Sequence, residues 1–389
     1  MRKYFHLPSN KIYLCGNSLG PQPKNAATQL ATEMQSWRER AVEGWWDGPD
    51  GGWLSYHRRA EKDLAAIVGA KSTEVTVANA LTVNLHLLLV SFFRPRGKRR
   101  KVLMEAGAFP SDQHAIISQL RFRGLDPATD LIEVAPRPGA VTLETEDILT
   151  AINEAGDELA LVLFSGVHYY TGQLFDLRAI AEAGRAVGAT VGFDLAHAVG
   201  NVSLRLHDWG ADFAVWCSYK YLNGGPGAPG GLFVHARHHD DETLPRFAGW
   251  WGHRESDRFQ MRKDFRPERG AAGWQVSTVP ILGMAPLVAA LPLFAAAGGM
   301  DELRRKSQQL TDRLYALLAT LPQARILTPK MRGAQLSVYV AGHRPELEQQ
   351  LSAAGLVVDY REDNLLGGNG GVLRLAPAPL YTSPEEVEQ

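Results

Sequence analysis

The chain has 389 residues, which is too long for one small core and predicts a large domain together with a smaller one. Its composition is 45% hydrophobic and 21% charged, and its net charge of -1 supplies no basic surface, so nucleic acid and anionic membranes are not expected as partners. Only Cys15 and Cys217 occur, which excludes a disulfide framework and a CxxC metal pair; we predict a cytoplasmic protein without a bound metal.

Residues 1–60 are rich in Trp, Gly and Pro and lack a continuous apolar signal segment. We expect them to pack on the large domain. After them, short β-branched runs alternate with helical ones. The predicted strands are Glu74–Ala78, Lys101–Glu105, Leu131–Val134, Leu159–Phe164, Thr190–Asp194, Phe213–Cys217 and Gly231–His235. Apolar strands joined by helices such as Leu177–Val187 predict an α/β fold with a mostly parallel sheet, here in a large domain of residues 61–298.

The stretch Val279–Met300 carries no charge and is long enough to span a bilayer. Three prolines interrupt it, at positions 280, 286 and 292, so a buried helix between the domains is favoured over a membrane span. A helix over Asp301–Leu321 then opens a small C-terminal α/β domain, residues 299–389. Its further elements are a strand Ala334–Val340, a helix Arg344–Ala353, and strands Val357–Arg361 and Val372–Ala376.

The predicted strand that contains Trp216 leads to Lys220. This lysine lies between Tyr219 and Tyr221, and a Gly-rich loop follows it. A lysine at a strand end usually extends to water. An unpaired ammonium buried among aromatic rings costs several kcal/mol, so such a lysine should be paired, neutralised or covalently used. A Schiff base with pyridoxal 5′-phosphate (PLP) would consume the amine.

Asp194 ends another predicted strand 26 residues before Lys220. PLP needs a carboxylate that keeps its pyridine nitrogen protonated, because that charge makes the ring an electron sink. An isolated Asp at a strand end is more often a helix cap. Asp194 and Lys220 at the ends of adjacent strands favour a PLP site, in which His197 could orient the ring or the Asp.

A phosphate site is also required. Thr82 follows a strand and opens a helix, whose free backbone N–H groups favour an anion, although a simple cap explains the same residues. Ser218 and Tyr219 are further candidate phosphate ligands. Phe109 could stack on the pyridine ring or belong to the core.

Five segments resemble the kynureninase family of fold-type-I PLP enzymes: GNSLGPQPK, EAGAFPSDQ, SGVHYYTGQ, FDLAHAVGN and WCSYKYLNGG. The resemblance runs from about Gly16 to Leu380. It implies hydrolysis of L-kynurenine to anthranilate and L-alanine by a homodimer with active sites at the subunit interface. No nucleic acid or membrane partner is expected.

The resemblance also implies roles for single residues. Lys220 would carry the Schiff base, and Asp194 would pair with the pyridinium. Tyr219 is the candidate acid for proton delivery, and Arg374 would bind the substrate α-carboxylate. The further expected cofactor contacts are Leu81, Thr82, Phe109, Asp112, Ser165, His197, Tyr219, Trp250 and Thr278; the further substrate contacts are Ser18, Trp46 and Thr278.

Family members differ in their preference for plain or 3-hydroxylated kynurenine. An aromatic residue in the N-terminal segment, here Trp45-Trp46, and a small residue at Thr278 go with the plain substrate. We therefore expect a preference for L-kynurenine, by about 1–3 kcal/mol, which is typical of one hydroxyl against an apolar wall.

Three alternatives share the fold. A cysteine desulfurase or selenocysteine lyase needs a nucleophilic cysteine near the substrate, and neither Cys15 nor Cys217 is placed for that by the sequence. An aminotransferase is compatible with the same PLP site. A non-catalytic ligand sensor is the third alternative, and the intact Lys220, Asp194 and Arg374 argue against it.

Overall fold

The computed structural model describes residues 1–342, 346–363, 366–367 and 370–389. Within them, the largest sheet has seven strands in the order β4-β10-β9-β8-β7-β5-β6. These strands are β4 (Val75–Val77), β5 (Lys101–Glu105), β6 (Leu131–Val134), β7 (Leu159–Ser165), β8 (Thr190–Asp194), β9 (Phe213–Trp216) and β10 (Gly231–Val234). In this sheet as described, β10 is antiparallel to both its neighbours, β4 and β9, and the other pairs are parallel, so the predicted mostly parallel α/β sheet is confirmed.

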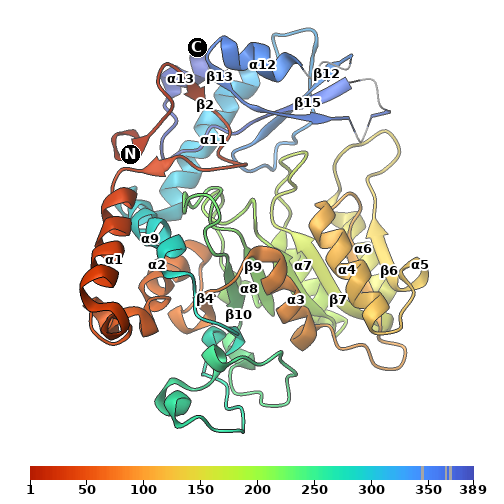
Figure 1. Ribbon diagram of the computed structural model, residues 1–389. Coiled ribbons are helices and arrows are strands. Elements are labelled where there is room, and N and C mark those ends of the chain that lie inside the picture. Colours follow the sequence, from red (N-terminus) through yellow and green to blue (C-terminus); the bar gives the residue numbers. More distant parts are fainter. Residues whose placement is uncertain (343–345, 364–365, 368–369) are drawn as a thin grey trace.

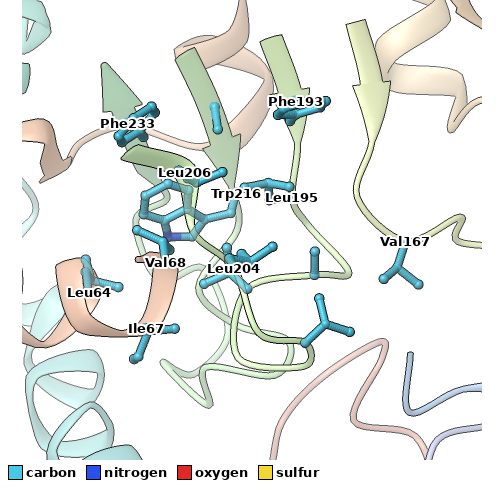
Figure 2. Packing of buried hydrophobic residues seen from close by; sticks show 14 of the residues in the cluster. Leu64, Ile67, Val68, Val167, Phe193, Leu195, Leu204, Leu206, Trp216 and Phe233 are labelled. Carbon is cyan, nitrogen blue, oxygen red and sulfur yellow. The ribbon is translucent and has the colours of Figure 1, made fainter. Parts of the chain in front are cut away.

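Helices cover both faces of this sheet (Figure 1). The main ones are α2 (Arg58–Val68), α3 (Leu81–Phe92), α4 (Pro110–Phe122), α6 (Thr145–Ala155) and α7 (Leu177–Ala186). Side chains alternate along a strand, so Leu103 of β5 packs in one core cluster and Val102 and Met104 pack in the other. Figure 2 shows the first cluster, in which Leu64 and Val68 of α2 lie near Trp216 at the end of β9.

A second sheet of four antiparallel strands forms the C-terminal part, in the order β11-β12-β15-β14. Its strands are β11 (Ala324–Ile326), β12 (Leu336–Ala341), β14 (Asp359–Glu362) and β15 (Gly370–Leu375), and its helices are α11 (Gly299–Leu318) and α12 (Glu346–Ala353). Leu310 and Leu314 of α11 pack with Leu336 and Leu373 of the sheet. The division into residues 1–60, 61–298 and 299–389 remains our proposal.

Two predicted elements differ in the structure. The stretch Val279–Met300 is not one helix but α9 (Ile281–Ala290) and α10 (Pro292–Ala296), because Pro292 has no N–H to continue the hydrogen bonds and takes a first-turn position instead. The predicted strand Val357–Arg361 divides at Val358 into β13 (Leu356–Val357) and β14, which belong to different sheets. Of the predicted helix Arg344–Ala353, residues 344–345 lie outside the described residues.

The N-terminal segment contacts both halves of the molecule. Its helix α1 (Ala26–Arg40) packs against α9. Its strand β2 (Ile12–Tyr13) pairs in parallel with β13, a contact that the sequence did not predict. In Figure 1 the red segment that holds β2 accordingly lies against the blue C-terminal part. The chain therefore brings residues near 15 next to residues near 360 and 375.

In the described part of the chain, no single helix has both the length and the apolar composition needed to cross a membrane, and only the bent pair Ile281–Ala296 with Gly299–Leu318 meets both criteria together.

Candidate active site

A cavity of about 360 Å³ lies at the carboxyl ends of the parallel strands, where ligands gather in open α/β sheets. Ser165 and Asp194, the last residues of β7 and β8, are cross-strand partners there. The lining residues are Asn17, Ser18, Leu81, Thr82, Phe109, Ser111, Asp112, Ser165, Val167, Tyr169, Asp194, Ala196, His197, Cys217, Tyr219, Lys220, Arg361 and Arg374. The structure thus brings most of the predicted site residues together.

Lys220 projects into this cavity from the loop after β9. Its Nζ lies 2.9 Å from Nε2 of His197. Burial, followed by the positive charges of Lys220 and Arg374, lowers the pKa of His197 well below its usual value. The imidazole is therefore neutral, and its hydrogen bond with the lysine amine holds that amine in the cavity.

Asp194 is buried, and its Oδ1 accepts a hydrogen bond from the backbone N–H of Ala196 at 2.7 Å. Asp112 is buried beside it. Burial first, then the charge of Asp194, raises the pKa of Asp112 well above its usual value, and burial also raises the pKa of Asp194, against the hydrogen bond from Ala196 and the charge of Lys220. Two buried carboxyl groups side by side therefore form a site that favours a cation, such as a protonated ring nitrogen.

Helices α3 and α4 both begin at the cavity. Ala80, the N-cap of α3, offers no side-chain hydrogen bond, so the simple capping explanation of this segment is not what the structure shows. Thr82 Oγ1 instead lies 2.6 Å from Ser111 Oγ in the first turn of α4. Two helix N-termini and two hydroxyl groups thus face one corner, which is a favourable arrangement for a phosphate.

These residues fit PLP. Among the described residues that line the cavity, Asp112 Oδ1 and Ser165 Oγ are buried without a hydrogen-bond partner, which is costly unless a bound group satisfies them. Ser218, a candidate phosphate ligand, is buried but is not among the lining residues. The lysine, the Asp194–Asp112 pair and the phosphate corner supply what the cofactor needs at its aldehyde, its ring nitrogen and its phosphate. A pocket of this size suits a small organic molecule.

Phe109 faces the cavity rather than the core, since 48% of its surface is exposed. Its ring centroid lies 5.8 Å from Lys220 Nζ and 5.2 Å from the edge-on ring of Tyr169. Of the two roles that the sequence left open, this position favours stacking on a bound ring. Tyr219 also lines the cavity, and burial, together with Cys217, raises its pKa to about 12, so its phenol keeps its proton at neutral pH.

Arg374 enters the cavity from β15 and is buried. Its Nε and Nη2 donate to the carboxylate of Asp359 at 2.9 and 2.6 Å, and its Nη1 donates to the carbonyl of Tyr169 at 2.8 Å. Ser18, from the N-terminal segment, lines the same region. The position of Arg374 supports the expected contact with a substrate carboxylate.

Trp46, Trp250 and Thr278 are not in this cavity of their own chain. They line a separate, largely aromatic cavity that also contains Phe259. Trp46 and Trp250 are 53% and 46% exposed, which is unusual for tryptophan. The expected contacts of Trp250 and Thr278 with the cofactor, and of Trp46 with the substrate, are therefore not made within one subunit.

Neither cysteine has the environment of a nucleophile. Cys217 lines the cavity but is buried, and burial raises its pKa. Burial, followed by the charge of Asp359, raises the pKa of Cys15 to about 11. Both thiols are protonated at neutral pH, which argues against the desulfurase alternative.

Comparison with known proteins identifies the family. The model of the class-V aminotransferase family matches residues 53–359. Curated kynureninases of Myxococcus xanthus and Stenotrophomonas maltophilia are each 51% identical, over 99% and 98% of this chain and 91% of their own length. A kynureninase of Flavobacterium psychrophilum is 50% identical over 98% of this chain and 90% of its own.

The chain belongs to the kynureninase family. Solved structures agree on the fold. A C-DES mutant with glycine covalently linked to the PLP cofactor has a TM-score of 0.83 at 18% identity and covers 100% of this chain and 97% of its own. A cysteine desulfurase from Thermococcus onnurineus has a TM-score of 0.82 at 20% identity, over 100% of this chain and 94% of its own. At such identities the likeness concerns the fold alone, whereas the sequence relatives identify this chain as a kynureninase-family enzyme.

Sequence reasoning missed several residues of the site. Tyr169 lies in the quoted SGVHYYTGQ segment, and Ser111 lies beside Asp112, so both could have been found there. Asp359 gives a weaker signal, because it is one of several charged residues in and after the predicted strand Val357–Arg361. Only the pairing of β14 with β15 shows that it faces Arg374.

Proposed function

We propose that this chain catalyses the PLP-dependent hydrolysis of L-kynurenine to anthranilate and L-alanine, with a preference for L-kynurenine over its 3-hydroxy form. The observation that carries this proposal is a cavity that holds Lys220, Asp194 and Arg374 in a chain about 50% identical to curated kynureninases. The two ends of an amino-acid substrate, its amine and its carboxylate, each have a matching group in that cavity.

PLP, when bound, supplies an electron sink conjugated with the substrate amine. Lys220, which His197 positions, would hold the cofactor through its Nζ and would serve as the base at the substrate Cα. Asp194 keeps a proton on the ring nitrogen. Arg374 binds the α-carboxylate and fixes the orientation of the side-chain ketone. Water adds to the ketone carbon, and the bond between that carbon and Cβ breaks, so that the ketone carbon leaves as the carboxylate of anthranilate. The phenol of Tyr219 delivers a proton to Cβ, which becomes the methyl group of L-alanine, and Lys220 returns the proton to Cα.

We further propose that two copies form a cytoplasmic homodimer in which the aromatic cavity of one subunit meets the PLP cavity of the other. Trp46, Trp250 and Thr278 would then contact the cofactor and the aryl ring of the substrate bound to the partner subunit. The exposure of the two tryptophans and the absence of all three residues from the lining of the PLP cavity of their own chain support this arrangement. Trp46 and Thr278 would form the wall of the site that favours the aryl ring of L-kynurenine over the 3-hydroxylated ring.

The experiment is a turnover assay on both substrates with the PLP-loaded protein. We expect anthranilate fluorescence to appear with L-kynurenine, and kcat/KM to be roughly 5- to 150-fold lower for the 3-hydroxy form. A higher kcat/KM for the 3-hydroxy form would overturn the preference. PLP-loaded protein that releases no anthranilate would overturn the activity.

A further inference from the structure

Asp359 and Arg374 are direct cross-strand partners, on β14 and β15. Both side chains are buried. The carboxylate binds one edge of the guanidinium, with Oδ1 accepting from Nε at 2.9 Å and Oδ2 accepting from Nη2 at 2.6 Å. Two parallel hydrogen bonds of this kind fix both the distance and the plane of an arginine.

The other edge of the guanidinium remains available. An arginine has five N–H donors, and Asp359 takes two while the carbonyl of Tyr169 takes one from Nη1 at 2.8 Å. The contact from Nη2 to Ser18 Oγ is long, at 3.5 Å. Nη1 and Nη2 of Arg374 therefore each keep one N–H that makes no short hydrogen bond among the described residues. These two donors can bind a carboxylate in the cavity.

Asp359 is itself held in place from two further directions. Its Oδ2 accepts from Ser18 Oγ at 2.7 Å and from Nη2 of Arg361 at 2.9 Å. Burial raises the pKa of Asp359, but the hydrogen bond and charge of Arg374, with smaller effects of Ser18 and Arg361, outweigh it and lower the pKa below the usual value. Asp359 is thus ionised at neutral pH, and its position is set by three segments of the chain.

Two opposite effects on a substrate are conceivable. The negative charge of Asp359 repels a second carboxylate, which would weaken binding. Its hydrogen bonds also hold Arg374 in one orientation, so less conformational freedom is lost when the substrate binds. Because Asp359 and the incoming carboxylate use different edges of the guanidinium, they do not compete for the same donors, and Arg361 offsets part of the repulsion.

We propose that Asp359 is a positioning residue that presents the free edge of Arg374 to the α-carboxylate of the substrate, with Ser18 locking the pair from the N-terminal segment. The proposal rests on the proposed function, in which Arg374 binds that carboxylate. It assigns to Asp359 the selectivity for α-amino acids over amines that lack a carboxylate.

The test compares the PLP-loaded wild type with Asp359→Asn, which keeps the shape and removes the charge. Glu302→Gln is the matched control, because Glu302 forms an exposed ion pair with Arg305 on α11, outside the cavity. Binding of L-alanine is followed by the change in visible absorbance of the cofactor. Binding of the amine that corresponds to kynurenine without its carboxylate is measured in the same way.

We expect Asp359→Asn to weaken L-alanine binding and to raise KM for L-kynurenine by about 10-fold or more, with kcat changed much less. Affinity for the amine and the properties of Glu302→Gln should stay at wild-type values. Unchanged or tighter L-alanine binding would show that Asp359 merely repels the ligand, and would overturn the proposal. Equal losses for L-alanine and the amine would also overturn it, as a general structural defect.

Ser18→Ala provides a second variant if Asp359→Asn does not fold, since it removes one hydrogen bond to Asp359 without leaving a buried cation unpaired. A smaller loss of L-alanine affinity, again without a loss for the amine, supports the proposal, and no loss contradicts it. The L-alanine measurement does not need kynurenine turnover. If the wild type binds L-alanine but does not cleave kynurenine, the proposed function is overturned. The role of Asp359 is then still tested by the L-alanine measurement.

Discussion

The amine of Lys220 lies 2.9 Å from Nε2 of a neutral His197, beneath the exposed ring of Phe109. This contact fixes the position of the amine within the cavity. It also connects the loop after β9 with the loop that follows Asp194, the last residue of β8. The geometry leads to a first prediction about the lysine itself.

Replacing Lys220 with Ala should lower kynurenine turnover by roughly 1,000-fold or more, because both the covalent anchor and the base at Cα are lost. The absorbance band of the cofactor-linked lysine should disappear, while the circular dichroism spectrum stays that of the wild type. Turnover near the wild-type rate would refute the assignment of Lys220.

Tyr219→Phe should lower kcat by roughly 100- to 10,000-fold with little change in KM, because the phenol is needed for proton delivery and not for substrate binding. Tyr221→Phe is the matched control. Tyr221 is buried next to the site but is not part of the cavity lining, and its hydroxyl has no hydrogen-bond partner among the described residues. Steady-state kinetics of the two variants should differ sharply, and equal kcat values would exclude Tyr219 as the acid.

Because of Glu105, the last residue of β5, we expect the folding stability of the protein to depend on pH. Its carboxylate accepts a backbone hydrogen bond from Ser165, and burial raises its pKa to about 7. Between the unfolded value near 4.5 and about 7, the folded state binds more protons than the unfolded state, so stability falls as pH rises through this window. Below the window Glu105 is protonated in both states and has no such effect.

Glu105→Gln removes this titration and keeps a hydrogen-bond acceptor for Ser165. Its Tm should match that of the wild type at about pH 4 and exceed it at about pH 8, by an amount that corresponds to at most about 3 kcal/mol. Thermal unfolding of both PLP-loaded proteins at these two pH values measures the difference. A variant that is less stable only at the higher pH would contradict the sign of the effect.

The proposed dimer predicts complementation between two inactive variants. Trp250→Ala damages the cavity contributed to the partner, whereas Lys220→Ala damages the cavity of its own chain. Each homodimer should be nearly inactive, but a mixed dimer contains one site with both an intact lysine and an intact tryptophan. Co-expression should therefore restore up to roughly a quarter of wild-type activity. Mixed dimers without activity would place Trp250 in the site of its own subunit. A fully active Trp250→Ala homodimer would place it outside both sites.

Much of the fold follows from local sequence. The strands Lys101–Glu105, Leu131–Val134 and Thr190–Asp194 are found at their predicted residues, because each is a short apolar run with clear ends. Asp194 and Lys220 were predictable as a pair for a related reason. Parallel strands end at the same edge of the sheet, so residues at strand ends meet without any knowledge of the connecting loops.

Long-range pairing could not be predicted in the same way. The break at Val358 is not marked by Gly or Pro; it arises because Leu356–Val357 pairs with residues of the N-terminal segment and Asp359–Glu362 pairs with β15. The partnership of Asp359 with Arg374 depends on that register. The separation of Trp46, Trp250 and Thr278 from the PLP cavity likewise depends on tertiary packing, which motif spacing does not report.

The hydrogen bond from Ser18 to Asp359 joins residues 341 positions apart, whereas Lys220 and His197 are 23 positions apart. Closing a long loop has a larger entropic cost, and contacts of high sequence separation tend to form slowly. During refolding, the cofactor pocket should therefore be assembled before the carboxylate site. A folding intermediate at that stage would already show the visible absorbance of bound PLP. It would not yet distinguish an amino acid from an amine that lacks a carboxylate.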